Sequence, residues 1–209
     1  MGGAAQPPVR WGEAPLGGRL GASLASLLDR LRAWIGRPAS ASLRGLPAVP
    51  LALRRGELAE RYLAAERATD HASAGAAAAA ALERAMAEAA WWPADVWGHR
   101  SLWHFERAGM ELDAVRAARL IGDVRTAGGD PTSARRYYAE AISEARDIGA
   151  EHEEGLAALG MGCAELELGD VTTARRLAQI ALDLLERSEA PPDEVAAARE
   201  LRGEEKEVG

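Results

Sequence analysis

The sequence is poor in the residues that mark secreted, membrane-spanning or metal-dependent proteins. Among its 209 residues there is one cysteine, one phenylalanine and one lysine. Cys163 cannot form an internal disulfide, which favours a reducing compartment. The first residues contain no apolar run that would serve as a signal-peptide core, and no stretch approaches the length of a membrane span. These absences predict a cytoplasmic protein.

Signatures of catalysis are also missing. There is no glycine-rich phosphate loop after a strand, no nucleophile with a sequence-visible base, and no alternating strand pattern. His99 and His104 fall on different faces of a helix, and nothing nearby completes a zinc-ligand set. The acids Glu151, Glu153 and Glu154 open a predicted helix, whose positive end accounts for them. We therefore expect no enzyme activity, no metal, no cofactor and no small-molecule substrate.

Proline is confined mainly to the first fifty residues and to positions 191–192. Proline interrupts helices, so its scarcity elsewhere predicts a helical repeat domain over 51–209. Residues 1–18, rich in Gly, Pro and Ala, are predicted to be a flexible tail, and 37–50, with three prolines, a linker. The predicted helices of the domain are 51–67, a segment ending near 90, 93–107, 111–127, 132–148, 151–168, 171–187 and a last one from about 193.

An amphipathic helix is predicted over 19–36. Its apolar residues occupy an arc of about 120° on a helix. An isolated helix of this length is marginal in water, so the face must be buried against a partner protein, the chain's own repeats or a lipid surface. Only Arg30 and Arg32 flank the arc, which is a weak attraction to anionic lipid. The predicted docking residues are Leu20, Leu24, Leu27, Leu28, Leu31, Trp34 and Ile35.

Charge is distributed unevenly along the chain. Residues 1–61 carry nine arginines and four acids, whereas 62–209 carry sixteen basic and twenty-eight acidic residues. A basic head on an acidic body indicates either an anionic partner for the head or a head that folds back on the body. The acidic body opposes direct DNA binding. We therefore predict a protein partner and no nucleic acid.

The clearest pattern is an internal repeat with an offset of forty residues. Eight of the twenty positions from 122 to 141 are identical forty residues later. A glycine inside a helix costs about 1 kcal/mol against alanine, so a repeated one indicates a second helix lying close over it. The repeated residues include Gly122 and Gly162, Gly129-Asp130 and Gly169-Asp170, Ala134 and Ala174, and Ala141 and Ala181.

Each unit is predicted to be an antiparallel helix pair. Gly129 and Gly169 can take the left-handed conformation that ends a helix, and Asp130 and Asp170 then cap the next helix. A degenerate earlier unit is predicted over 51–90, from small and apolar residues at the spacing of a second helix.

This pattern resembles the tetratricopeptide repeat over about 115–188. The small residue of the first helix, the Gly-Asp turn and the second-helix motif correspond to Gly122, Gly129-Asp130 and Ala134, Tyr138, Ala141. The period of forty is longer than the family's usual ~34 residues, and alanine replaces the bulky first-helix residue. The resemblance implies an all-α, right-handed superhelix of antiparallel helix pairs that binds proteins.

The resemblance also implies that the first helices line a concave groove for a partner. If Arg116 and Arg119 line it, reversing their charge should weaken binding without changing stability. The function predicted is an adaptor or scaffold. The alternative is an accessory subunit of a larger assembly, including a membrane-associated one, docked by the 20–35 helix. The implied groove residues are Arg116, Arg119, Asp123, Thr126, Leu156, Leu159, Cys163 and Leu166.

A cluster of tryptophans lies just before the repeat. Aromatic side chains bury large areas, so the cluster predicts a helix that fills the junction between the earlier unit and the clear repeats. An exposed aromatic anchor for a partner is the alternative. The cluster comprises Trp91, Trp92, Trp97 and Trp103, with His99, His104 and Phe105.

Overall fold

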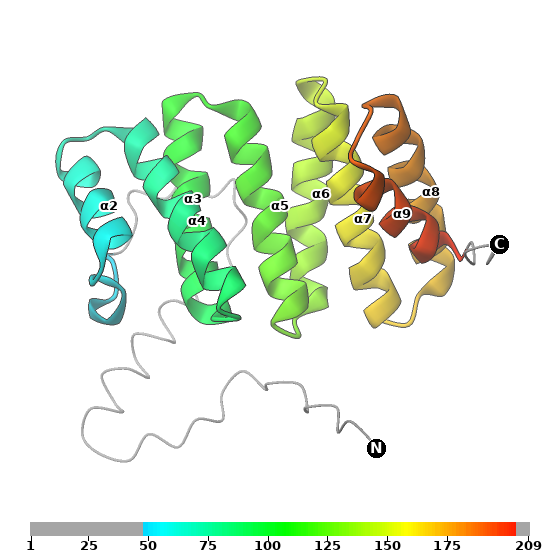
Figure 1. Ribbon diagram of the computed structural model, residues 1–209, viewed down its shortest axis with the longest axis horizontal. Coiled ribbons are helices and arrows are strands. Elements are labelled where there is room, and N and C mark those ends of the chain that lie inside the picture. The colour runs from blue at the N-terminus through cyan, green and yellow to red at the C-terminus, as the bar shows by residue number, and fades with distance from the viewer. Residues whose placement is uncertain (1–47, 204–209) are drawn as a thin grey trace, which may run out of the picture. The chain divides into compact units, whose positions relative to one another are not determined.

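The computed structural model describes residues 48–203, which contain a short 3-10 helix, eight α-helices and no strand (Figure 1). The predicted fold class, an all-α succession of antiparallel helix pairs, is confirmed. The predicted tail, amphipathic helix and most of the linker lie outside the described residues. The elements are η1 (Leu51–Leu53), α2 (Glu57–Arg67), α3 (His71–Ala87), α4 (Trp91–Ala108), α5 (Glu111–Ala127), α6 (Pro131–Asp147), α7 (Glu151–Glu167), α8 (Val171–Arg187) and α9 (Pro192–Arg202).

Every connection from α2 to α9 uses the same turn. A residue with positive φ follows each helix, and the next residue donates its amide to the carbonyl five positions back, as Asp130 does to Arg125 at 2.8 Å. This is the Schellman geometry that ends helices. The turns recur every twenty residues, so the repeat of forty spans two helices and two turns. The positive-φ residues are Thr69, Ala89, Gly109, Gly129, Gly149, Gly169 and Glu189.

The predicted helix caps are present at both repeated turns. The Asp130 carboxylate accepts a hydrogen bond from the amide of Ser133 at 3.1 Å, and Asp170 accepts one from Thr173 at 3.0 Å. Such caps stabilise a helix by about 1 kcal/mol because they satisfy an amide that the helix itself leaves unpaired. The Gly-Asp turn and its cap are therefore confirmed.

The earlier repeat unit is α3–α4, not the predicted 51–90. α3 and α4 begin forty residues before α5 and α6, and α3 packs more extensively against α4 than against α2. The sequence comparison missed it because side-chain sizes are exchanged at the helix contact. In the α5–α6 unit, Gly122 faces Tyr138, whereas the equivalent residues of α3 and α4 are Leu82 and Gly98.

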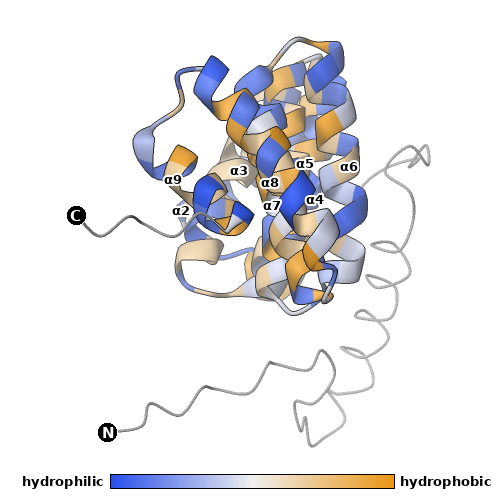
Figure 2. Ribbon diagram, turned by 90° about the vertical axis from the view of Figure 1, so that its right-hand side faces the viewer, coloured by the Kyte–Doolittle hydropathy of each residue, from blue (hydrophilic) through white to orange (hydrophobic). Residues whose placement is uncertain are grey.

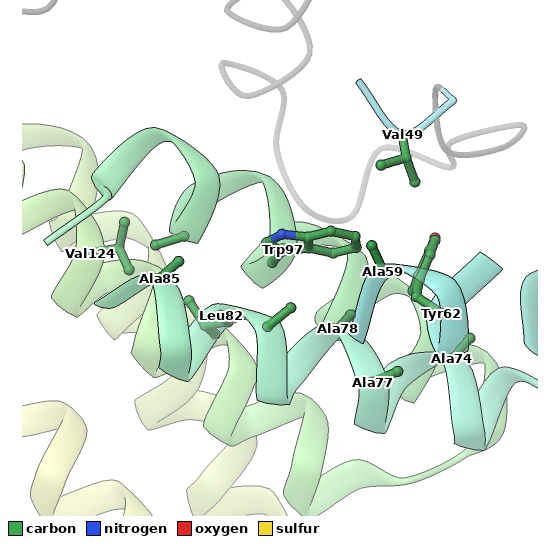
Figure 3. Close-up of a cluster of buried hydrophobic side chains, with 12 residues drawn as sticks. Val49, Ala59, Tyr62, Ala74, Ala77, Ala78, Leu82, Ala85, Trp97 and Val124 are labelled. Atoms are coloured by element: carbon green, nitrogen blue, oxygen red, sulfur yellow. The ribbon is translucent and has the colours of Figure 1, made fainter. Parts of the chain in front are cut away.

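The predicted helix 51–67 is broken in the structure. η1 and α2 are separated by three residues that include Gly56, whose φ is 95°. Val49, assigned from sequence to the linker, is only 2% exposed and belongs to the apolar cluster that contains Ala59, Tyr62 and Trp97. Figure 3 shows the Trp97 ring directed from α4 toward α2. The apolar core of the described domain thus includes Val49.

The two ends of the row are closed by short helices of eleven residues, α2 and α9. α2 packs on α3, and α9 packs on α8 and α7. Terminal helices such as α2 and α9 cover apolar surface that a further repeat would otherwise bury.

The helices carry both apolar and polar residues around their circumference (Figure 2). Among the described residues, none of the helices combines the length and apolarity that a membrane crossing requires.

One side of the row is formed by α3, α5 and α7, the first helices of the three units. α5 contacts α7 directly and α7 contacts α9, whereas the second helices α4, α6 and α8 have at most marginal contact with one another. α5 and α7 therefore lie closer together than the second helices of successive units do. We call the surface formed by α3, α5 and α7 the inner face.

Candidate functional site: the inner face

The predicted groove residues all lie on α5 and α7, two helices that contact each other. None of them is fully buried. The residues on α5 are Arg116, Arg119, Asp123 and Thr126, and those on α7 are Leu156, Leu159, Cys163 and Leu166. The structure divides them into two groups, a polar one on α5 and an apolar one on α7.

The polar group is held by Glu153, which the sequence did not identify as part of this surface. Its carboxylate, on the first turn of α7, is 4% exposed and accepts from Arg116 Nε at 2.7 Å and Arg119 Nε at 3.1 Å. A buried carboxylate needs such partners, because desolvating an unpaired charge costs several kcal/mol. The helix-terminus explanation of Glu153 was therefore incomplete. The two arginines tie α5 to α7.

A second carboxylate extends this network to α6. Asp123 accepts from Arg119 Nη1 at 2.9 Å and from the hydroxyl of Tyr138 at 2.8 Å. Burial raises the pKa of Asp123, while Arg119 and the Tyr138 hydroxyl act in the opposite direction. Burial likewise raises the pKa of Tyr138, so its hydroxyl stays protonated as a donor. Three helices are thus linked through one chain of charge-assisted bonds.

The Tyr138 ring is held between two glycines. A Cβ at Gly122 on α5 would lie 2.7 Å from the Tyr138 ring, and one at Gly160 on α7 would lie 2.5 Å from it. The close approach predicted at Gly122 is confirmed, and its partner is an aromatic ring. Gly162 is also closely approached, by the Leu201 side chain of α9 at 2.8 Å and the Ala174 carbonyl at 3.3 Å. Both repeated glycines are required by packing.

The apolar group forms a stripe along α7. Leu159, Cys163 and Leu166 are spaced four and three residues apart, which places them on one helical face. Leu166 is 47% exposed and Cys163 is exposed, whereas Leu159 is half-buried against the core. Burial, followed by the charge of Asp123, raises the pKa of the Cys163 thiol. This thiol is therefore a weak nucleophile.

The tryptophan-rich helix α4 is a structural element. Ten of its eighteen residues are buried, including Trp97 and Phe105. Trp91, Trp92 and Trp103 are half-buried, so none is a fully exposed anchor. Trp97 and Phe105 are buried as predicted, but α4 is the second helix of the first repeat unit and does not fill a junction between units.

Both histidines of α4 hold hydrogen bonds between helices. His104 Nε2 lies 3.1 Å from the Tyr62 hydroxyl of α2, and its Nδ1 lies 2.9 Å from Nδ1 of His71 on α3. His99 Nε2 lies 2.8 Å from the Tyr137 hydroxyl of α6. Burial lowers the pKa of His104 to about 4, so this ring is neutral at neutral pH.

A buried ion pair joins α4 to α5. Arg125 donates to both carboxylate oxygens of Asp95, at 2.6 and 3.1 Å, and Asp95 is 3% exposed. Bidentate pairs of this kind are strong and geometrically specific. No short motif in the sequence signals the pair, because thirty residues separate its members. It links the first repeat unit to the second.

The titratable groups among the predicted groove residues are Arg116, Arg119, Asp123 and Cys163. Among the described residues, no group of three His, Cys, Asp or Glu side chains is arranged to hold a metal ion. Glu153 is engaged by two arginines, Asp123 by Arg119 and the Tyr138 hydroxyl, and the Cys163 thiol is weakly acidic. Comparison with known proteins finds no family model that matches the chain and no similar curated protein.

Proposed function

We propose that this chain is a non-catalytic, tetratricopeptide-like adaptor or scaffold that binds a partner protein through its inner face. The observation that carries the proposal is the partly exposed stripe of Leu159, Cys163 and Leu166 beside the arginine and carboxylate network of α5. Apolar side chains on a rigid surface with a polar border are typical of protein-binding sites.

The network on α5 supports the proposal because it makes the surface rigid. Arg119 is held by both Glu153 and Asp123, so little side-chain entropy is lost there when a partner binds. The partner expected is a segment with apolar side chains that pack on Leu159 and Leu166. We also propose a reducing, cytoplasmic location, because the chain has a single cysteine and so cannot form an internal disulfide.

Substitution of Leu166 by arginine tests this function. The full-length protein and its Leu166→Arg variant are used as baits in the native host, with partners identified by mass spectrometry. The control is Ile180→Arg on α8, because Ile180 is 40% exposed and Leu166 is 47% exposed. We expect partners lost with Leu166→Arg and retained with Ile180→Arg, with equal melting temperatures. Partners unaffected by Leu166→Arg would exclude the inner face as the binding surface.

A second candidate function is an accessory subunit fixed in a larger assembly, including a membrane-associated one, by residues 20–35. It rests on the seven apolar residues that fall on one helical arc in that segment. Co-purification separates the two candidates. A subunit would remain with its assembly at high salt and through gel filtration, whereas an adaptor would exchange its partner.

A further inference from the structure

A cleft of about 330 Å³ lies at the first turns of α5, whereas Leu166 lies in the last turn of α7. It is formed where the α4–α5 turn meets the carboxyl end of α6. Its floor is apolar and consists of Met110, Ala114, Val115 and Ile148, of which Ile148 is 37% exposed. The volume suits one or two side chains of a bound segment. This cleft is separate from the apolar stripe on α7.

The rim of the cleft is acidic. Glu106 comes from the last turn of α4, Glu111 from the first turn of α5, and Glu144 and Asp147 from the end of α6. Among the described residues that line the cleft, none is basic. Burial, followed by the charge of Glu144, raises the pKa of Glu106, while Arg107 acts in the opposite direction. The rim thus concentrates negative charge around an apolar floor.

Two arginines near the rim, Arg107 and Arg146, have partners outside the cleft. Arg107 lies over the ring of Trp103, with its Cζ 4.2 Å from the ring centroid. Arg146 donates to Glu154 of α7 at 2.6 Å. Arg107 compensates part of the charge of Glu106, but the described residues that line the cleft include four acids and no basic residue, so the rim stays negative.

We propose that this cleft is a second protein-docking site, which accepts a partner segment carrying a lysine or arginine next to a bulky apolar residue. The apolar side chain would pack on Met110 and Ile148, and the cation would lie among Glu106, Glu144 and Asp147. Charge complementarity carries the choice of occupant, because a neutral or acidic segment would leave the like charges of the rim uncompensated. The proposal does not depend on the inner face being a binding site.

Selection from a random twelve-residue peptide library on the full-length protein tests the proposal. A parallel selection uses the triple variant Glu106→Gln/Glu144→Gln/Asp147→Asn, which keeps side-chain shape and removes three charges. Peptides enriched only on the unmodified protein should carry a basic residue within four positions of Leu, Ile, Phe or Trp. The triple variant should melt at the same temperature or higher, because like charges have been removed.

One enriched peptide, labelled with fluorescein, then gives quantitative comparisons by anisotropy. We expect its Kd to rise about tenfold in the triple variant, with a similar rise between 0.05 and 0.5 M salt, since each of three partly exposed charge pairs contributes a modest factor. Ile148→Ser should also weaken binding, and Leu166→Arg on the inner face should leave it unchanged. Any of three results would overturn the proposal: no enriched peptide, equal enrichment on the unmodified protein and on the triple variant, or enriched peptides that lack basic residues.

Discussion

The α5–α6 and α7–α8 units have the same backbone and different surfaces. Gly122 and Gly162 both lie under a close contact from a neighbouring helix, and the turns after α5 and α7 have the same conformation. On the inner face, however, Arg119 and Asp123 of α5 are replaced by Leu159 and Cys163 of α7. The two units therefore share the residues that the helix contacts need, and they differ at these positions outside the core.

The α3–α4 unit extends this comparison. It keeps the helix bounds of the later units but reverses the sizes at the contact, with Leu82 on the first helix and Gly98 on the second. A Cβ at Gly98 would lie 2.8 Å from Ile121 of α5. A large residue against a small one satisfies the packing in either arrangement.

Reversing the charge of Arg116 and Arg119 should have the largest effect on stability. The double variant Arg116→Glu/Arg119→Glu places two carboxylates against the buried Glu153, and we expect a loss of about 3–5 kcal/mol. This replaces the expectation that these arginines affect binding alone. Denaturant unfolding followed by circular dichroism measures it. Arg175→Glu/Arg176→Glu on the exposed side of α8 is the matched control, and equal losses in both would contradict the Glu153 network.

Leucine at either repeated glycine should destabilise the domain, and more at Gly122 than at Gly162. The Tyr138 ring over Gly122 is fixed by Asp123 and by Gly160, whereas Leu201 over Gly162 belongs to the terminal helix α9. We expect losses of about 3 kcal/mol for Gly122→Leu and about 2 kcal/mol for Gly162→Leu.

The corresponding alanine variants sharpen the same comparison. Gly162→Ala should be close to neutral, because a gain of about 1 kcal/mol in helix propensity offsets a small shift of Leu201. Gly122→Ala should remain destabilising. Thermal melts followed by circular dichroism compare the two, and equal melting temperatures would mean that Tyr138 is as free to move as Leu201.

Acidification should weaken the front of the domain more than the back. His104 has its pKa lowered by burial from 6.5 to about 4, so the unfolded chain takes up a proton that the folded state does not. Stability from the neutral ring is fully present above pH 6.5 and is lost as the pH falls from 6.5 to about 4. We expect the free energy of unfolding to fall by about 2 kcal/mol over this pH range.

The variant His104→Phe tests this assignment. It removes the titrating ring and keeps the bond from the Tyr62 hydroxyl to Glu66. Its unfolding free energy should be lower at neutral pH but should change less between pH 6.5 and 4 than that of the parent. An unchanged slope over this range would show that other groups cause the acid sensitivity.

The smallest expected effect concerns the Cys163 thiol, which lies in the apolar stripe on α7. The raised pKa of Cys163 means that less thiolate is present at pH 8, so alkylation by iodoacetamide should be several-fold slower than for a free cysteine. Asp123→Asn should increase the rate modestly by removing one of the charges that disfavour the thiolate. A faster rate than free cysteine would contradict the described surroundings of Cys163.

Much of the fold could be predicted because its signals are local. The helices from 93 onward, the Gly-Asp turns and the caps at Asp130 and Asp170 follow from proline, glycine and capping preferences within a few residues. The sequence did not predict the break in the helix expected over 51–67. Its only local sign is Gly56, and a glycine also occurs at helix ends without a break of this kind. The unit α3–α4 was missed because packing conserves combined size and not identity.

The sequence by itself determined an all-helical chain with a turn every twenty residues and a close helix contact at Gly122 and Gly162. Only the tertiary structure decided that Arg116 and Arg119 meet Glu153, thirty-seven and thirty-four residues away. It also brought Glu106 and Glu144 to one cleft. Helix formation depends on neighbours within a turn, whereas these pairings depend on how successive helices cross, which the side chains of all the helices set together.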